Sequence, residues 1–282
     1  MPSGGRIPLD HGRRDQLAED LNAAPVWVFN AGISHHDEIN TTDIALDGIE
    51  FARGPTTSRW GRVRAGLGHP RPFDLRMVAI GNENCGFYNY RGNYLKFHDA
   101  IKRYYPDMKI ISNCDATFAP LDHPADLFDF HIYSTSKDLF SKYNKFDSLN
   151  RTGAKAFVSE YAVWKEDAAA GSFLSALGEA ESSGATYLNS KLEAPSSVLA
   201  STIVVNFDNS SVSLDITING LGSNEKFSGI TKTFLASSNV RDENSFDHPK
   251  KIVLQQSPLE NAGSNMKVTF PPNSITSFDL PK

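Results

Sequence analysis

The sequence lacks the features that mark several large classes of protein. Its 28 lysines and arginines are outnumbered by 33 aspartates and glutamates, so no basic surface is available for nucleic acid and we expect no such partner. No apolar run approaches the roughly 20 residues of a membrane-spanning helix, so we expect no membrane partner. The first residues, Met1 to Arg6, contain no apolar core of a signal peptide, and we expect this sequence not to enter the secretory pathway by itself.

Cysteine is also scarce. The two cysteines, Cys85 and Cys114, each follow a predicted strand and could lie near each other at one rim. We favour two free thiols, because a cysteine often serves as a small apolar residue. Two cysteines identify no compartment. Three glycosylation sequons, at Asn40, Asn150 and Asn209, would matter only in a secreted protein.

What the sequence does contain is an alternation of short apolar strands and amphipathic helices from Val26 to Ala180. Such an alternation predicts βα units and a parallel sheet. A closed barrel of this type needs eight strands, and the pattern supplies five. The predicted strands are Val26–Asn30, Arg76–Gly81, Lys109–Asn113, Phe128–Tyr133 and Ala156–Glu160, and the predicted helices are 16–24, 43–53, 94–105, 138–143 and 168–180.

After Glu181 the pattern changes. Serine, threonine and asparagine become more frequent, and helical periodicity disappears. The segments 197–206, 211–219 and 267–270 read as strands separated by turns, which predicts an all-β sandwich. All three tryptophans precede this part, so we interpret it as an accessory domain rather than a sugar-binding one. We therefore predict a loose leader over 1–15, a catalytic domain over 16–180 and a sandwich over 181–282.

Two glutamates follow strands of the predicted parallel sheet. Asn82 and Glu83 come directly after the strand Arg76–Gly81, and Glu160 ends the strand that begins at Ala156. Parallel α/β folds place their chemistry at the carboxyl ends of strands, and two carboxylates are what glycoside hydrolysis needs. One strand-end glutamate is more often a helix cap or an ion-pair partner. Two of them, one preceded by asparagine, favour catalysis.

Several segments together resemble plant α-L-arabinofuranosidases of glycoside hydrolase family 51. The resemblance begins near Leu17 and runs to the end of the chain. Its segments are Pro25–Asn30, Ile49–Gly54, Val78–Glu83, Phe130–Tyr133, Phe157–Ala162, Asp242–Phe246 and Pro271–Ser274. The resemblance implies a partial (β/α)₈ barrel followed by a C-terminal β-sandwich, and a retaining hydrolase that releases terminal α-L-arabinofuranosyl residues from arabinan or arabinoxylan. It implies no metal and no cofactor.

The resemblance also implies roles for individual residues. Glu83 matches the acid/base, and Glu160 matches the nucleophile. Asn82 would bind the sugar 2-hydroxyl, and Tyr133 would stabilise the charge of the nucleophile. The remaining substrate-binding candidates are His131, which shares a His-x-Tyr pattern with Tyr133, and Trp164, which either walls the sugar subsite or is an ordinary packed loop tryptophan.

The sequence also departs from the family pattern. No counterparts of the first, second and eighth barrel strands are found, so we expect a curved sheet with two exposed edges. We expect Glu83 and Glu160 on one rim at the roughly 5–5.5 Å of a retaining pair. Two alternatives stay open: an inactive truncated remnant, and a related retaining glycosidase acting on xylosides or glucosides. By resemblance the location would be extracellular, in the cell wall.

Overall fold

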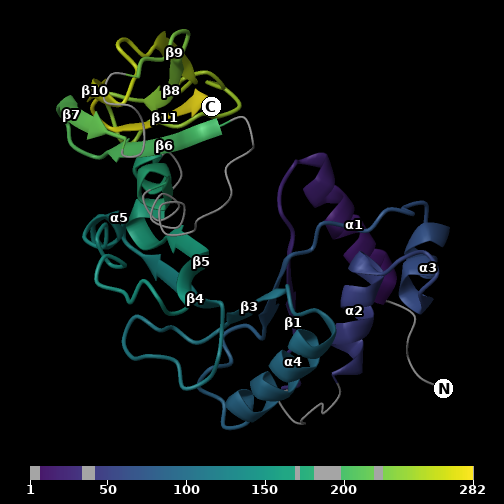
Figure 1. The fold of residues 1–282 in the computed structure, drawn as a ribbon. Coiled ribbons are helices and arrows are strands. Elements are labelled where there is room, and N and C mark those ends of the chain that lie inside the picture. The colour runs from purple at the N-terminus through teal and green to yellow at the C-terminus, as the bar shows by residue number, and fades with distance from the viewer. Residues whose placement is uncertain (1–6, 34–41, 169–171, 181–197, 219–224, 282) are drawn as a thin grey trace. The chain divides into compact units, whose positions relative to one another are not determined.

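The computed structural model describes residues 7–33, 42–168, 172–180, 198–218 and 225–281 (Figure 1). The chain divides into two compact units. The first comprises Met1–Phe130 and Asn150–Phe157, and the second comprises His131–Leu149 and Val158–Lys282. The domain boundary predicted at 180/181 borders residues outside the described part and stays a prediction.

Five strands form one sheet whose spatial order follows the sequence, β1-β2-β3-β4-β5. The pairs β1–β2, β2–β3 and β3–β4 are parallel. This arrangement is part of a (β/α) barrel, in which each strand lies beside the next one along the chain. All five predicted strands are confirmed, with ends that differ by at most three residues: β1 (Val26–Phe29), β2 (Met77–Ile80), β3 (Lys109–Ser112), β4 (Leu127–Ser134) and β5 (Lys155–Val163).

The core of the first unit lies between the sheet and its covering helices. Val78, Ile80 and Ile110 point to one face of the sheet and pack in one buried cluster with Ile49 of α2 (Asp43–Arg53) and Tyr94 of α4 (Tyr90–Tyr104). The alternate residues of the strands form a smaller apolar layer, which contains Ala79, Ile111 and Leu127. This division follows from the two-residue period of a strand.

Two helices of the first unit correct the sequence analysis. Helix α1 (Ile7–Asp20) begins inside the segment predicted as a loose leader, and it ends before the predicted Ala24. Helix α3 (Arg59–Gly66) was not predicted. The periodicity of α3 is hidden because a charged residue, Arg64, faces the core with only 1% of its surface exposed. Its guanidinium donates to the carbonyls of Phe51 at 2.6 Å and Gly54 at 2.8 Å, which satisfies the C-terminal end of α2.

The second unit contains two antiparallel sheets. Their orders are β6-β11-β8-β9 and β10-β7, and Met266, Val268, Phe270 and Phe278 are buried in their core. This is the predicted β-sandwich. Three strands confirm the predicted segments: β6 (Val198–Asn206), β7 (Val212–Thr217) and β10 (Asn265–Phe270). Three further strands were not predicted: β8 (Thr231–Ala236), β9 (Gln255–Pro258) and β11 (Ser274–Pro281).

The remaining helical segments of the second unit are short. They are α5 (Ser136–Phe140), the 3₁₀ turn η1 (Lys165–Ala168) and residues 173–180. The helix predicted at 138–143 corresponds to α5, which begins and ends closer to the N-terminus. The helix predicted at 168–180 begins only at residue 173. Among the helices in the described part of the chain, none has the length and apolarity to cross a membrane.

Candidate active site

Glu83 lies in a tight turn directly after β2. Two residues of this turn have a left-handed backbone, Gly81 with φ of 85° and Glu83 with φ of 53°. At Gly81 a Cβ would approach Ala31, Asn84 and Tyr90 to 3.1 Å, so only glycine fits there. For a non-glycine residue such as Glu83, the left-handed conformation costs about 1–2 kcal/mol. Strain of this kind gathers at functional sites, where the surrounding contacts maintain it.

The side chain of Asn113 maintains the turn. Its side-chain amide is assigned the orientation in which both the oxygen and the nitrogen have hydrogen-bond partners. The amide oxygen then accepts from the backbone N–H groups of Asn82 at 3.0 Å, Glu83 at 2.7 Å and Asn84 at 2.8 Å, and its nitrogen donates to the hydroxyl of Tyr90 at 3.0 Å. Sequence reasoning did not single out Asn113, although the polar end of its predicted strand was a usable signal.

In the second unit, three predicted residues meet at the ends of β4 and β5. The hydroxyl of Tyr133 donates to Oε2 of Glu160. The Nε2 atom of His131 lies 3.6 Å from Oε1 of Glu160 and 3.0 Å from Oγ of Ser159. The Glu160 side chain is 35% exposed and that of His131 is 14% exposed. The Tyr133 hydroxyl therefore orients the Glu160 carboxyl group, and the partial exposure of this side chain leaves it accessible.

The other predicted site residues occupy exposed positions. Asn82 and Glu83 are both exposed, and Trp164 retains 45% of its surface exposed just after β5. The backbone N–H of Trp164 donates to the carbonyl of Ser134 at 2.9 Å, which ties the loop after β5 to the end of β4. Trp164 is thus an exposed aromatic surface rather than a packed core residue. The separation between the carboxyl groups of Glu83 and Glu160 stays a prediction.

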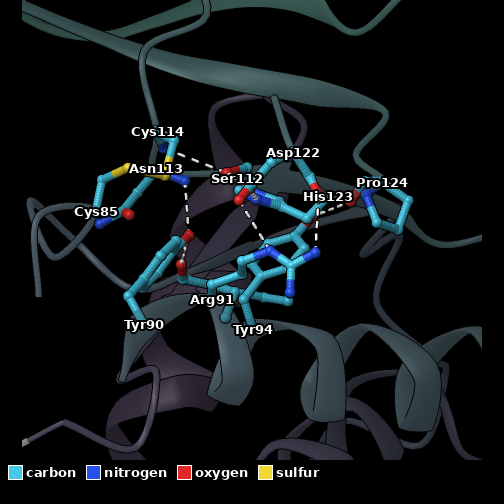
Figure 2. A network of polar contacts seen from close by, with 11 residues as sticks. Cys85, Tyr90, Arg91, Tyr94, Ser112, Asn113, Cys114, Asp122, His123 and Pro124 are labelled. Carbon is cyan, nitrogen blue, oxygen red and sulfur yellow. Dashed lines mark hydrogen bonds and ion pairs between the residues drawn. A yellow bond between two sulfur atoms is a disulfide. The ribbon is translucent and has the colours of Figure 1, made fainter. Parts of the chain in front are cut away.

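The two cysteines correct the sequence analysis. Cys85 and Cys114 form a disulfide with Cα atoms 5.1 Å apart, whereas two free thiols were predicted. Figure 2 shows this bond beside Asn113, at the point where the turn after β2 meets the end of β3. The prediction was wrong because 29 residues separate the two cysteines along the chain, and only the pairing of β2 with β3 brings them together.

A hydrogen-bonded chain of Ser112, His123 and Asp122 lies in the same region (Figure 2). His123 Nε2 is 2.7 Å from Ser112 Oγ, and its Nδ1 is 2.7 Å from Asp122 Oδ1. This is the order that serine hydrolases use, but Ser112 is 0% exposed and its Oγ accepts from the backbone N–H of Cys114 at 3.2 Å. No substrate can reach that hydroxyl, so these hydrogen bonds stabilise the fold and do not form a catalytic site. The hydrogen bond with His123 lowers the pKa of Asp122 below its usual range.

Comparison with known proteins gives one consistent result. The family described as Alpha-L-arabinofuranosidase 1 domain matches residues 15–151. Alpha-L-arabinofuranosidases 1 and 2 of Arabidopsis thaliana are 44% and 45% identical to the chain over 97% and 96% of its length. The chain spans about half of these curated relatives, 52% and 51% of their length. The extracellular exo-alpha-L-arabinofuranosidase of Streptomyces chartreusis is 33% identical over 57% of the chain and 22% of its own length.

Solved structures agree on the fold. The structure of an arabinose-bound MgGH51 α-L-arabinofuranosidase superposes with a TM-score of 0.72 at 21% sequence identity. The match covers 95% of this chain and 56% of the chain of that enzyme. The thermostable GH51 enzyme from Thermotoga petrophila RKU-1 matches 94% of this chain and 77% of its own with a TM-score of 0.61 at 15% identity. Because the partial barrel, the sandwich and the Arabidopsis relatives all agree, the chain belongs to the α-L-arabinofuranosidase family.

Proposed function

We propose that the chain is a retaining glycoside hydrolase that releases terminal α-L-arabinofuranosyl residues from arabinan- or arabinoxylan-type polysaccharides. Glu160 is the nucleophile and Glu83 is the acid/base. The observation that carries the proposal is the hydrogen-bonded group at the ends of β4 and β5, where Tyr133 and His131 both contact the Glu160 carboxylate. A carboxylate held in this orientation can attack an anomeric carbon.

The mechanism assigns one task to each residue. Glu160 forms the bond to the anomeric carbon while Glu83 gives its proton to the leaving-group oxygen, and a glycosyl-enzyme results. Glu83 then takes a proton from water, which attacks the same carbon and releases Glu160. Asn82 binds the sugar 2-hydroxyl, a contact that strengthens as the oxocarbenium ion develops. Trp164, with its exposed ring, forms a wall of the sugar subsite.

A mechanism-based label tests the nucleophile. A 2-fluoro arabinofuranoside with a good leaving group is expected to add one sugar mass to the wild-type chain, located at Glu160 by peptide mapping. Glu160→Gln should take up no label, and Tyr133→Phe should label roughly 10²-fold more slowly, because it loses a donor to the reacting carboxylate. The matched control is Glu243→Gln, which changes an exposed glutamate and should label like the wild type.

Substrate class is tested in parallel. Nitrophenyl α-L-arabinofuranoside is expected to be hydrolysed faster than the corresponding xyloside and glucoside. A chain that prefers either of the latter would be a related glycosidase with another sugar. A chain that neither takes up the label nor releases nitrophenol would be an inactive member of the family.

We also infer that the chain works in an oxidising compartment, as an extracellular protein of the cell wall. The disulfide supports this inference, because such bonds persist mainly outside the cytosol. The sequons at Asn150 and Asn209 lie at exposed positions, whereas Asn40 is outside the described residues. Intact mass of protein isolated from its natural source should reveal an oxidised Cys85–Cys114 pair and N-linked sugar. Reduced cysteines and unmodified asparagines would overturn the inference.

A further inference from the structure

The turn that carries Glu83 is connected to β3 at two points. One is the side-chain amide of Asn113, which accepts from three successive backbone N–H groups at 2.7–3.0 Å. The other is the disulfide from Cys114, the next residue, to Cys85, which lies two residues beyond Glu83. Three successive N–H groups that converge on one acceptor define a fixed backbone path. The direction in which the Glu83 side chain leaves the backbone is therefore set at β3.

Asn113 is itself held in place. Only 8% of its surface is exposed, and Tyr90 beside it is 1% exposed. The Tyr90 hydroxyl accepts from the backbone N–H of Asn113 at 3.0 Å and donates to the carbonyl of Ile80 at 2.9 Å. Figure 2 shows the phenol pointing at Asn113 from the start of α4. Ile80 is the last residue of β2, so the same hydroxyl joins both strands.

We propose that Asn113 is a positioning residue for Glu83, whose side chain it directs by binding the backbone of residues 82–84, with Tyr90 and the Cys85–Cys114 disulfide keeping Asn113 in place. The proposal rests on the proposed role of Glu83 as the acid/base. It makes Asn113 important for protonating the leaving group, although Asn113 takes part in no bond-making step. Its own side chain is engaged with the turn and with Tyr90.

The first experiment measures hydrogen exchange of single amides in the full chain by nuclear magnetic resonance. In Asn113→Ala, the amides of residues 83 and 84 should exchange roughly 10-fold faster than in the wild type, because their acceptor is gone. The amide of Asn82 also donates to Oδ1 of Asn84 at 3.1 Å, so its exchange rate should change less. The amide of Gly81, which donates to the carbonyl of Phe29 at 2.8 Å, should keep its rate. Unchanged exchange at residues 83 and 84 would overturn the proposal whether or not the chain is active.

Two variants separate positioning from general loss of stability. Asn113→Asp keeps an acceptor facing the three N–H groups, and it should retain their protection. Asn93→Ala removes another buried asparagine of the same unit, whose amide donates to the carbonyl of Gly32 at 3.4 Å; it should leave residues 82–84 protected. If Asn113→Ala does not fold, loss of protection in Asn113→Asp would contradict the proposal and retained protection would support it.

The second experiment compares leaving groups. A misdirected acid should slow substrates whose leaving group needs a proton by roughly 10²-fold, while an activated nitrophenyl substrate should change by less than about 3-fold because its leaving group needs little protonation. Equal loss on both substrates in Asn113→Ala would overturn the positioning role. A wild-type chain inactive on both would instead refute the proposed function, and the exchange experiment would still decide whether Asn113 holds the turn.

Discussion

At the scale of single residues, two buried tyrosines predict how the first unit responds to alkali. Burial raises the pKa of Tyr90 to about 12, and it raises the pKa of Tyr94 further. In the unfolded chain both groups ionise near pH 10. Their contribution to stability is therefore fully present below about pH 10, and it is lost as the pH rises through the folded values.

We expect the free energy of unfolding of the first unit to fall by about 3 kcal/mol between pH 10 and 12 from Tyr90 alone. Ultraviolet absorbance of ionised tyrosine should show an early phase from exposed side chains and a later phase that coincides with loss of circular dichroism. Tyr88→Phe removes a side chain that is 99% exposed, so it should reduce only the early phase. A single phase without loss of structure would contradict the prediction.

At the scale of elements, two helical glycines predict opposite effects of the same substitution. A Cβ at Gly48 of α2 would lie 2.2 Å from Cη2 of Trp27, whereas a Cβ at Gly92 of α4 would meet nothing within 4 Å. Alanine normally stabilises a helix relative to glycine by about 1 kcal/mol. At Gly48 that gain is exceeded, because Trp27 is part of the strand β1 that α2 covers.

Gly48→Ala should therefore destabilise the first unit by about 1–3 kcal/mol through overpacking. Gly92→Ala should stabilise it by about 0.5–1 kcal/mol. Urea denaturation followed by tryptophan fluorescence measures both. Equal shifts in one direction would show that α2 is not packed on β1 as closely as described.

At the scale of the whole molecule, the disulfide is the covalent link with the largest predicted effect on stability. It closes a loop across 29 residues that contains all of α4. Removal of such a bond costs about 3 kcal/mol, because the unfolded chain regains its freedom. Cys85→Ala combined with Cys114→Ala should lower the thermal midpoint of the first unit's transition, as should reduction of the wild type.

The double variant supplies its own control, since a reductant should not change its midpoint further. The transition of the sandwich, whose strands carry no cysteine, should stay where it is. A midpoint that is the same with and without the disulfide would mean that the loop is already ordered in the unfolded ensemble.

Much of the architecture follows from local sequence patterns. The apolar runs Val26–Phe29, Met77–Ile80, Ile110–Ile111 and Ala156–Val158 specify strands because each is short and is followed by glycine or a polar residue. The same locality placed Glu83 just after β2 and Glu160 in the C-terminal half of β5, which continues three residues beyond the predicted end. Strands β8, β9 and β11 escaped prediction for different local reasons: β8 begins with the polar run Thr231–Thr233, and β9 contains only Gln255 to Pro258. In β11 two buried positions are polar, because Ser274 and Thr276 are both 0% exposed. Their pairing partners, not their own propensities, make them strands.

Only the tertiary structure decided the contacts between residues that lie far apart in the chain. The sequence by itself determined the order of strands and helices, the family resemblance and the two strand-end glutamates, because these depend on neighbouring residues. The disulfide, the three hydrogen bonds received by Asn113 and the burial of Arg64 depend on which strands and helices lie side by side. No periodicity records that information, since a cysteine, an asparagine or an arginine reads the same in a loop as in a buried network.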